Sequence, residues 1–312
     1  MYYLYTKNTI DPINFYGLSL YSRYPGNNQL NLDFLKEGID YFKINQETPI
    51  AGIGSCFAAE LKKWLIKNNF NFIETVKGLP ADGGSAAFYY VYNTYTILQQ
   101  FQIAFDSFNP IETYWKYVDN DGIDRILDPY RARIAWESFE DMQNEKKEHA
   151  NNVRYAFSKA KVIVMTLGLS EIWYNNKDGA VFANGPPCEV VDNKNHRFRL
   201  TTVYENLNNL NEAFKLVKKY NNDVKFIISL SPVPLSTTYR PLNSVIANST
   251  SKAILRVAAD IFSSLNKDVV YFPSYEIATI LESNPYIEDN RHIKPETINT
   301  IMGFFCDLFV NE

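Results

Sequence analysis

Four short apolar runs, each separated from the next by helical patterns, constrain the fold of this chain most strongly. The clearest run is Lys161–Gly168, which is almost wholly apolar and ends at a glycine. Such a run is typical of a strand buried on both faces. Similar runs lead into Ser55 and span Val224–Leu230 and Val269–Phe272. The alternation of helix and buried strand predicts right-handed βαβ units, and therefore an α/β fold with a mostly parallel central sheet flanked by helices.

The first 45 residues differ from the rest of the chain. They are rich in tyrosine and asparagine, carry turn signals at Tyr24–Asn28 and show no sustained hydrophobic period. We expect residues 1–45 to form an extended arm packed on the main domain. Residues 46–312 form the α/β domain, because no repeat or low-complexity linker divides them.

Charge and cysteine usage exclude several classes of function. The formal net charge is −4 and there is no long basic run, which argues against nucleic-acid binding. The sequence has neither a basic leader followed by an apolar stretch nor an 18-residue apolar segment, so we expect a cytoplasmic protein without a transmembrane segment. The three cysteines, Cys56, Cys188 and Cys306, are too widely spaced for a disulfide framework or structural zinc, and we expect neither a metal nor a bound cofactor.

Ser55 lies at the end of the first predicted strand, where a helix is predicted to begin. Gly52 and Gly54 permit a tight backbone path, and a helix over Cys56–Lys67 would direct its N-terminal amides at the serine. Those amides favour negative charge developing nearby. Two roles are open for Ser55: it caps this helix, or it acts as a nucleophile.

The carboxyl ends of parallel strands meet at one edge of a sheet, where α/β proteins bind ligands. This rule brings together Ser55, the turns Gly168–Glu171 and Ser231–Pro232, and the loop Asp289–His292. The three-residue spacing lets Asp289 contact one imidazole nitrogen of His292 while the other faces Ser55. That is the arrangement that orients and activates a serine nucleophile.

The other two histidines are weaker candidates for a catalytic base. His149 lies on a polar helical pattern, and His196 lies in a charged Lys-Asn-His-Arg segment. We expect both side chains at the surface. His292 is therefore the candidate base.

Several ordered motifs resemble the GSCFA family, which is related to the SGNH/GDSL hydrolases, over roughly residues 45–310. The resemblance implies a flavodoxin-like SGNH-hydrolase three-layer sandwich, with Ser55 in the first conserved block and Asp289 and His292 in the last. The segments that carry it are Gly54-Ser55-Cys56-Phe57-Ala58, Thr166–Trp173, Ser231–Leu235, Ala247-Asn248 with Ser251-Lys252, Tyr271–Glu276 and Asp289–His292.

The resemblance also implies an oxyanion hole made by the amide of Ser55, Gly84 and Ser170. Gly84 lies in the breaker-rich loop Lys77–Ser85. The third block of SGNH enzymes reads Gly-x-Asn-Asp, and Ser170 takes the position of its asparagine here. A serine hydroxyl is shorter than an asparagine amide, so Asn93 is an alternative donor.

The implied activity is that of an SGNH-type esterase or O-acyltransferase. It would remove or transfer an O-acyl group, such as acetyl, on a carbohydrate in surface-polysaccharide metabolism, through an acyl-Ser55 intermediate. Acyl-CoA is a candidate donor and a glycan precursor a candidate acceptor. The alternative is a non-catalytic carbohydrate-binding or assembly module on the same scaffold, with Ser55 only capping its helix.

Cys56 is either a second nucleophile or a core side chain. Asn248, Lys252 and Arg256 lie at spacings that place them on one helix face, which is either a docking site for a phosphate or carboxylate or a solvated surface. The candidate substrate contacts are Asn93, Glu171, Asn248, Lys252 and Arg291.

Overall fold

The computed structural model describes residues 24–25, 30–36, 41–76, 84–105, 107–119, 121–132 and 134–311. The chain divides into two compact units, Met1–Phe42 and Lys43–Glu312. Among its described residues, the first unit contains a short 3-10 helix, η2 (Phe34–Lys36). Most of the predicted arm lies outside the described residues, as do residues 77–83 of the loop before Gly84. The path of the arm therefore stays a prediction.

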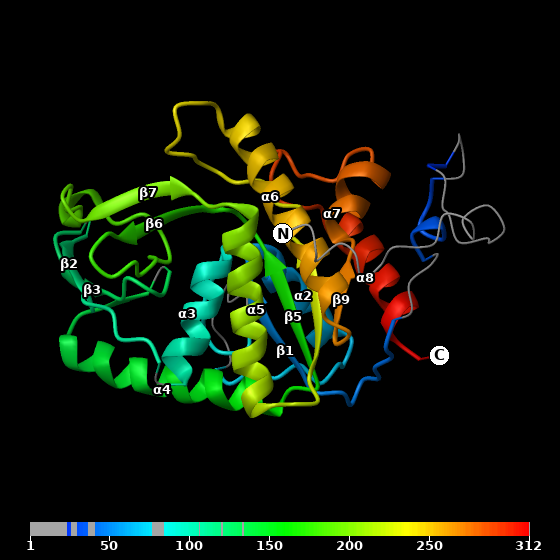
Figure 1. Ribbon diagram of the computed structural model, residues 1–312, viewed down its shortest axis with the longest axis horizontal. Helices are drawn as coiled ribbons and strands as arrows, with labels where there is room; N and C mark the ends of the chain where they lie inside the picture. The colour runs from blue at the N-terminus through cyan, green and yellow to red at the C-terminus, as the bar shows by residue number, and fades with distance from the viewer. Residues whose placement is uncertain are drawn as a thin grey trace. The chain divides into compact units, whose positions relative to one another are not determined.

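The second unit is built on a four-stranded parallel sheet, as the apolar runs predict (Figure 1). The strands follow the order β1 (Ile50–Gly54), β5 (Val162–Leu167), β8 (Lys225–Leu230) and β9 (Val269–Phe272), and each neighbouring pair is parallel. All six residues of β5 are buried. The register aligns Gly54 with Thr166, Thr166 with Ser229, and Ser229 with Phe272, so the carboxyl ends of the strands finish at one edge.

Helices cover both faces of this sheet. Ile163, Met165 and Leu167 join the core shared with α3 to α6, whereas Phe272, whose side chain lies on the other face, contacts three phenylalanines of α8. Within the described ranges, none of the helices combines the length and the apolarity that a bilayer-spanning helix needs. The helices are α2 (Cys56–Lys67), α3 (Thr94–Ala104), α4 (Phe139–Lys159), α5 (Val203–Tyr220), α6 (Ser244–Leu265), α7 (Ser274–Glu276), which continues as the π-helix η4 (Ile277–Leu281), and α8 (Pro295–Phe309).

Two small antiparallel sheets are formed by segments that lie between the main strands along the chain. One consists of β2 (Trp115–Val118), β3 (Asp124–Leu127) and β4 (Ala135–Trp136), and its first two strands form a hairpin. The other pairs β6 (Glu171–Asn175) with β7 (His196–Leu200), which are joined by a long loop that includes the 3-10 helix η3 (Cys188–Val190). Because β6 begins four residues after β5 ends, this second hairpin rises from the edge where the site is predicted.

The predicted surface positions of His149 and His196 are both wrong. His149 is 3% exposed, and its Nε2 lies 3.0 Å from Gln100 Oε1. It belongs with Met142 and Val153 to the buried stripe of α4, which charged neighbours conceal in the sequence. His196 is 5% exposed because β7 packs its side chain against Glu112.

Candidate active site

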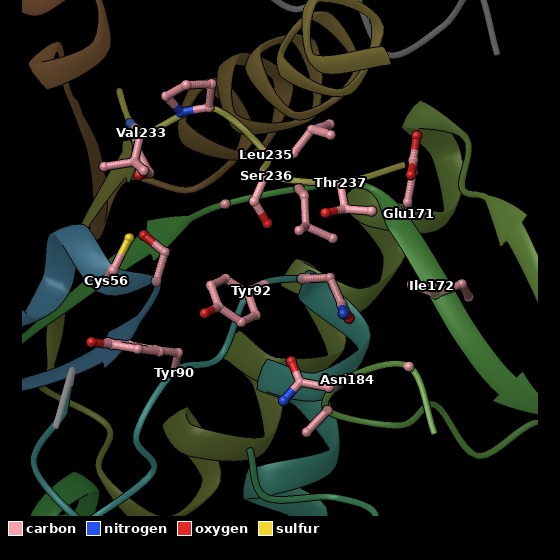
Figure 2. Close-up of a pocket in the computed structure, with 18 of the residues that line it drawn as sticks. Cys56, Tyr90, Tyr92, Glu171, Ile172, Asn184, Val233, Leu235, Ser236 and Thr237 are labelled. Carbon is pink, nitrogen blue, oxygen red and sulfur yellow. Dashed lines mark hydrogen bonds between the residues drawn. The ribbon is translucent and has the colours of Figure 1, made fainter. Parts of the chain in front are cut away.

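A pocket of about 460 Å³ opens at the carboxyl edge of the sheet and contains most of the predicted site. Figure 2 shows Cys56 and Tyr90 at one side of it, Glu171 and Ile172 at the other, and Tyr92 between them. The predicted residues Ser55, Asn93, Glu171, Arg291 and His292 all line this pocket. No three His, Cys, Asp or Glu side chains of the described segments converge as metal ligands would.

Ser55 lies where β1 passes into α2, as predicted. It occupies the N-cap position of α2, but its side chain makes no capping hydrogen bond. Its Oγ lies 3.3 Å from Thr166 Oγ1 instead. Gly54 makes this close approach to β5 possible, because a Cβ at that position would lie 2.2 Å from Thr166 Oγ1. The structure thus gives the hydroxyl a place in the pocket and no capping role.

The amide of Ser55 is not positioned as an oxyanion donor. It donates to the side-chain and backbone oxygens of Thr166, at 3.1 and 3.3 Å. The predicted role of this N–H group in an oxyanion hole therefore conflicts with its place in the connection between β1 and β5.

His292 and Asp289 form the predicted pair in the loop that precedes α8. Asp289 Oδ1 accepts the backbone N–H groups of Arg291 and His292, each at 2.9 Å, and Asp289 Oδ2 contacts His292 Nδ1. These hydrogen bonds, that from His292 first, lower the pKa of Asp289 to about 2. The carboxylate is therefore charged at neutral pH, which places the imidazole proton on Nδ1 and leaves Nε2 available as a base.

A second pocket, of about 440 Å³, is also lined by His292. It runs between α2 and the start of α8 and is mainly apolar, with Trp64 and Ile298 in its wall. Cys56, Tyr90, Val233 and His292 line both pockets. The candidate base thus stands where two cavities meet.

Asn93 combines a capping role with a position in the pocket. Its Oδ1 accepts the N–H group of Thr96 at 2.9 Å and so caps α3. The described residues offer no acceptor to its Nδ2, and the residue lines the pocket together with Ser55. The capping bond fixes the amide plane, so Asn93 is a pre-oriented donor.

Ser170 and Gly84 do not meet the role that the family resemblance implies. The hydroxyl and the amide of Ser170 both donate to Ser251 Oγ, at 3.0 and 2.7 Å, and the residue is not in the pocket wall. Gly84 packs against the middle of β1, where a Cβ would lie 2.8 Å from the carbonyl oxygen of Gly52. Both positions serve packing behind the site.

The helix face of Asn248, Lys252 and Arg256 is not an anion site. Lys252 is 2% exposed and donates to the carbonyl oxygens of Gly168, Ser231 and Val233, at 2.8, 2.7 and 2.9 Å. Burial lowers its pKa to about 7. Asn248 accepts the amide of Leu235, and Arg256 pairs with Glu276. These side chains hold the strand ends in place and leave no cation for a phosphate.

Cys56 lines the pocket beside Ser55. Burial raises the pKa of its thiol, although Lys252, Arg291 and the backbone N–H groups at the start of α2 lower it in part. A raised pKa keeps the thiol protonated, which favours packing over nucleophilic attack.

Sequence reasoning missed the aromatic side of the pocket and the partner of Ser55. Trp173 and Phe198 lie on the β6–β7 hairpin, which the sequence shows only as loop and hairpin material. Thr166 is buried within a strand, where nothing in the sequence distinguishes it from a core residue. Tyr239 lies in the loop after β8, which carries no periodic pattern.

The sequence profile of the GSCFA family matches residues 49–305. This range includes the four main strands and every residue placed in the pocket above. The resemblance seen in the motifs is thereby confirmed. No curated protein matches the sequence.

Proposed function

The chain belongs to the GSCFA family, and we propose that it is a serine-dependent enzyme of acyl esters. In this proposal Ser55 is the nucleophile, His292 the general base and Asp289 the residue that orients it. One observation supports it most: Asp289 fixes His292 in the same pocket that holds Ser55 at the start of α2.

The first step follows from the protonation of the pair. Asp289 stays ionised and holds the imidazole proton on Nδ1, so Nε2 can accept the proton of Ser55. For attack, Ser55 Oγ exchanges its contact with Thr166 Oγ1 for one with His292 Nε2, which lines the same pocket. The oxygen then forms a bond to the ester carbon, and the carbonyl electron pair moves onto the carbonyl oxygen.

Asn93 Nδ2 is the donor that we assign to the resulting oxyanion. It replaces Ser170 and Gly84 in this role, because it lines the pocket and they do not. The N-terminal end of α2 adds its partial positive charge at the same place. One such donor contributes about 2.7–4 kcal/mol to barrier lowering in other acyl-transfer enzymes.

The tetrahedral intermediate collapses when His292 returns the proton to the leaving alcohol, which leaves an acyl-Ser55 ester. Water or a second alcohol then attacks that ester, with His292 again as the base. The second pocket supports a role for a separate acceptor, since His292 lines it as well as the first. Hydrolysis and transfer, with acyl-CoA as a donor, thus share one acyl-enzyme.

The proposal is tested by turnover of p-nitrophenyl acetate and of acetyl-CoA, each with and without added alcohols. We expect release of p-nitrophenol or of coenzyme A that Ser55→Ala and His292→Ala abolish, and a new ester product where transfer occurs. If the wild-type protein turns over neither compound, the proposed enzyme is contradicted and the pocket is a binding module.

A further inference from the structure

Three aromatic side chains form one wall of the first pocket, and we call this set the aromatic wall: Trp173, Phe198 and Tyr239. Trp173 on β6 and Phe198 on β7 are directly paired across the hairpin, and their ring centroids are 5.6 Å apart. Tyr239 comes from the loop after β8, at 5.0 Å from Trp173 and 5.3 Å from Phe198. Two distant segments thus bring three rings to one place.

The aromatic wall is open to a ligand. Tyr239 is 61% exposed, whereas Trp173 and Phe198 are partly buried. Gly185 approaches the wall so closely that a Cβ there would lie 3.2 Å from both Trp173 Nε1 and Tyr239 Oη. A side chain at residue 185 would therefore push against both rings and displace them.

Hydrogen-bonding groups surround the rings. Figure 2 shows Asn184 on one side of the pocket and Ser236 and Thr237 across from it. Trp173 Nε1 is buried and finds no acceptor among the described residues. Glu171 also lines the pocket, with its carboxylate held by Thr238 at 2.9 Å. The three rings are inclined to one another by 52 to 89°, so the wall is a set of separate apolar ring faces with polar groups around it.

We propose that the aromatic wall binds a pyranose ring, which makes the ester substrate an acylated carbohydrate. A sugar whose hydroxyls are equatorial, as in glucose or N-acetylglucosamine, presents flat C–H faces to aromatic rings and hydroxyls to the polar rim. An aliphatic chain would leave those polar groups without partners. This inference deepens the proposed function. That the bound sugar carries an ester rests on the proposed function, whereas the binding of sugar is argued from the aromatic wall alone.

Binding is measured on the Ser55→Ala protein, so the result does not depend on catalysis. The probes are cellotriose and chitotriose, and the readouts are calorimetry and tryptophan fluorescence, to which Trp173 contributes as one of four tryptophans. We expect at least one trisaccharide to bind and to quench fluorescence. The added changes Phe198→Ala and Gly185→Val should each raise Kd about tenfold or more, and Trp173→Phe should remove the quenching. Tyr155→Ala, which removes a ring that is 58% exposed on α4 and outside the pocket, is the matched control and should leave Kd unchanged.

The outcomes separate this inference from the proposed function. Failure of both trisaccharides to bind, or binding that Phe198→Ala and Gly185→Val leave unchanged, would overturn the sugar site. Sugar binding by a protein whose wild-type form turns over no ester would support the site and contradict the enzyme. Ester turnover without sugar binding would support the enzyme and contradict the sugar site.

Discussion

Two histidine–carboxylate pairs are found among the described residues, one beside the pocket and one buried away from it, and they differ in what the carboxylate does. In the pair of His292 and Asp289 the carboxylate contacts Nδ1, the histidine side chain is 50% exposed, and the ring lines two pockets. In the pair of His196 and Glu112 the carboxylate lies 2.9 Å from Nε2, and the histidine is buried. Only the first pair has a ring nitrogen left for chemistry.

The second nitrogen of His196 explains the difference. Its Nδ1 accepts the backbone N–H group of Asp192 at 3.1 Å, so the ring proton lies on Nε2 and is donated to Glu112. Glu112 also accepts hydrogen bonds from Trp115 and Asn175. This pair therefore joins three segments of the chain, whereas the pair in the pocket leaves Nε2 without a partner among the described residues. A neighbouring carboxylate alone does not identify a catalytic histidine.

The largest expected effect comes from removing the base. His292→Ala should lower kcat for an aryl acetate by up to about 10⁶-fold, to the level that binding and the oxyanion donor sustain. The matched change, His196→Ala, removes the histidine of the other pair and should leave kcat of the folded protein near that of the wild type. Equal losses in the two variants would refute the distinction between the pairs.

Asp289→Asn tests the orientation of the base. The amide oxygen still accepts the two backbone N–H groups, but its NH₂ group donates to Nδ1 and moves the ring proton to Nε2, so kcat should fall by about 10⁴-fold. Because the pKa of Asp289 is about 2, the carboxylate keeps its charge well below neutral pH. Asp289 should therefore take up no proton in the wild-type kcat/KM profile above about pH 4. An acid limb above that pH that Asp289→Asn removes would contradict this assignment.

The oxyanion donor is tested by comparing two substitutions, each of which removes one hydrogen-bond donor. Asn93→Ser keeps a capping side chain for α3 but removes the Nδ2 donor, and kcat should fall about 10²- to 10³-fold. Ser170→Ala removes a hydroxyl whose partner is Ser251, so it should cost about 1 kcal/mol of stability and leave kcat nearly unchanged. Steady-state kinetics and urea unfolding of both variants provide the measurement. A larger loss of kcat in Ser170→Ala would restore the role that the family resemblance implies.

The smallest expected effect concerns the buried pair of His196 and Glu112. Glu112→Ala leaves His196, Trp115 and Asn175 without their shared acceptor, which should lower the free energy of unfolding by about 1–3 kcal/mol. The kcat of the folded protein should not change, because none of these residues lines the pocket. A loss of kcat without a loss of stability would show that this pair, too, acts in the reaction.

The sheet and the positions of Ser55, Asp289 and His292 were predictable, because each depends on local pattern. An apolar run marks a buried strand, and the carboxyl-edge rule then places its following turn. The role of Ser170 was not predictable from its aligned position, because its orientation is set by Ser251, far away in sequence. The same limit applies to His149 and His196, whose polar neighbours conceal buried contacts made across the fold.

The aromatic wall shows the limit most clearly. Trp173 and Phe198 come together only through the register of β6 and β7, and Tyr239 joins them from a loop without any periodic pattern. Composition indicates only that the chain is rich in aromatic residues, with 22 tyrosines and 21 phenylalanines. Which of them face the pocket depends on contacts between segments far apart in sequence, and local sequence patterns do not reveal such contacts.

The most direct test of the central claim is to map the covalent adduct of a fluorophosphonate probe by peptide mass spectrometry. The account predicts one adduct, on Ser55, that forms in the wild type and in Cys56→Ala but not in His292→Ala. An adduct on Cys56, or labelling of Ser55 at an unchanged rate in His292→Ala, would contradict the assignment of Ser55 and His292 as nucleophile and base.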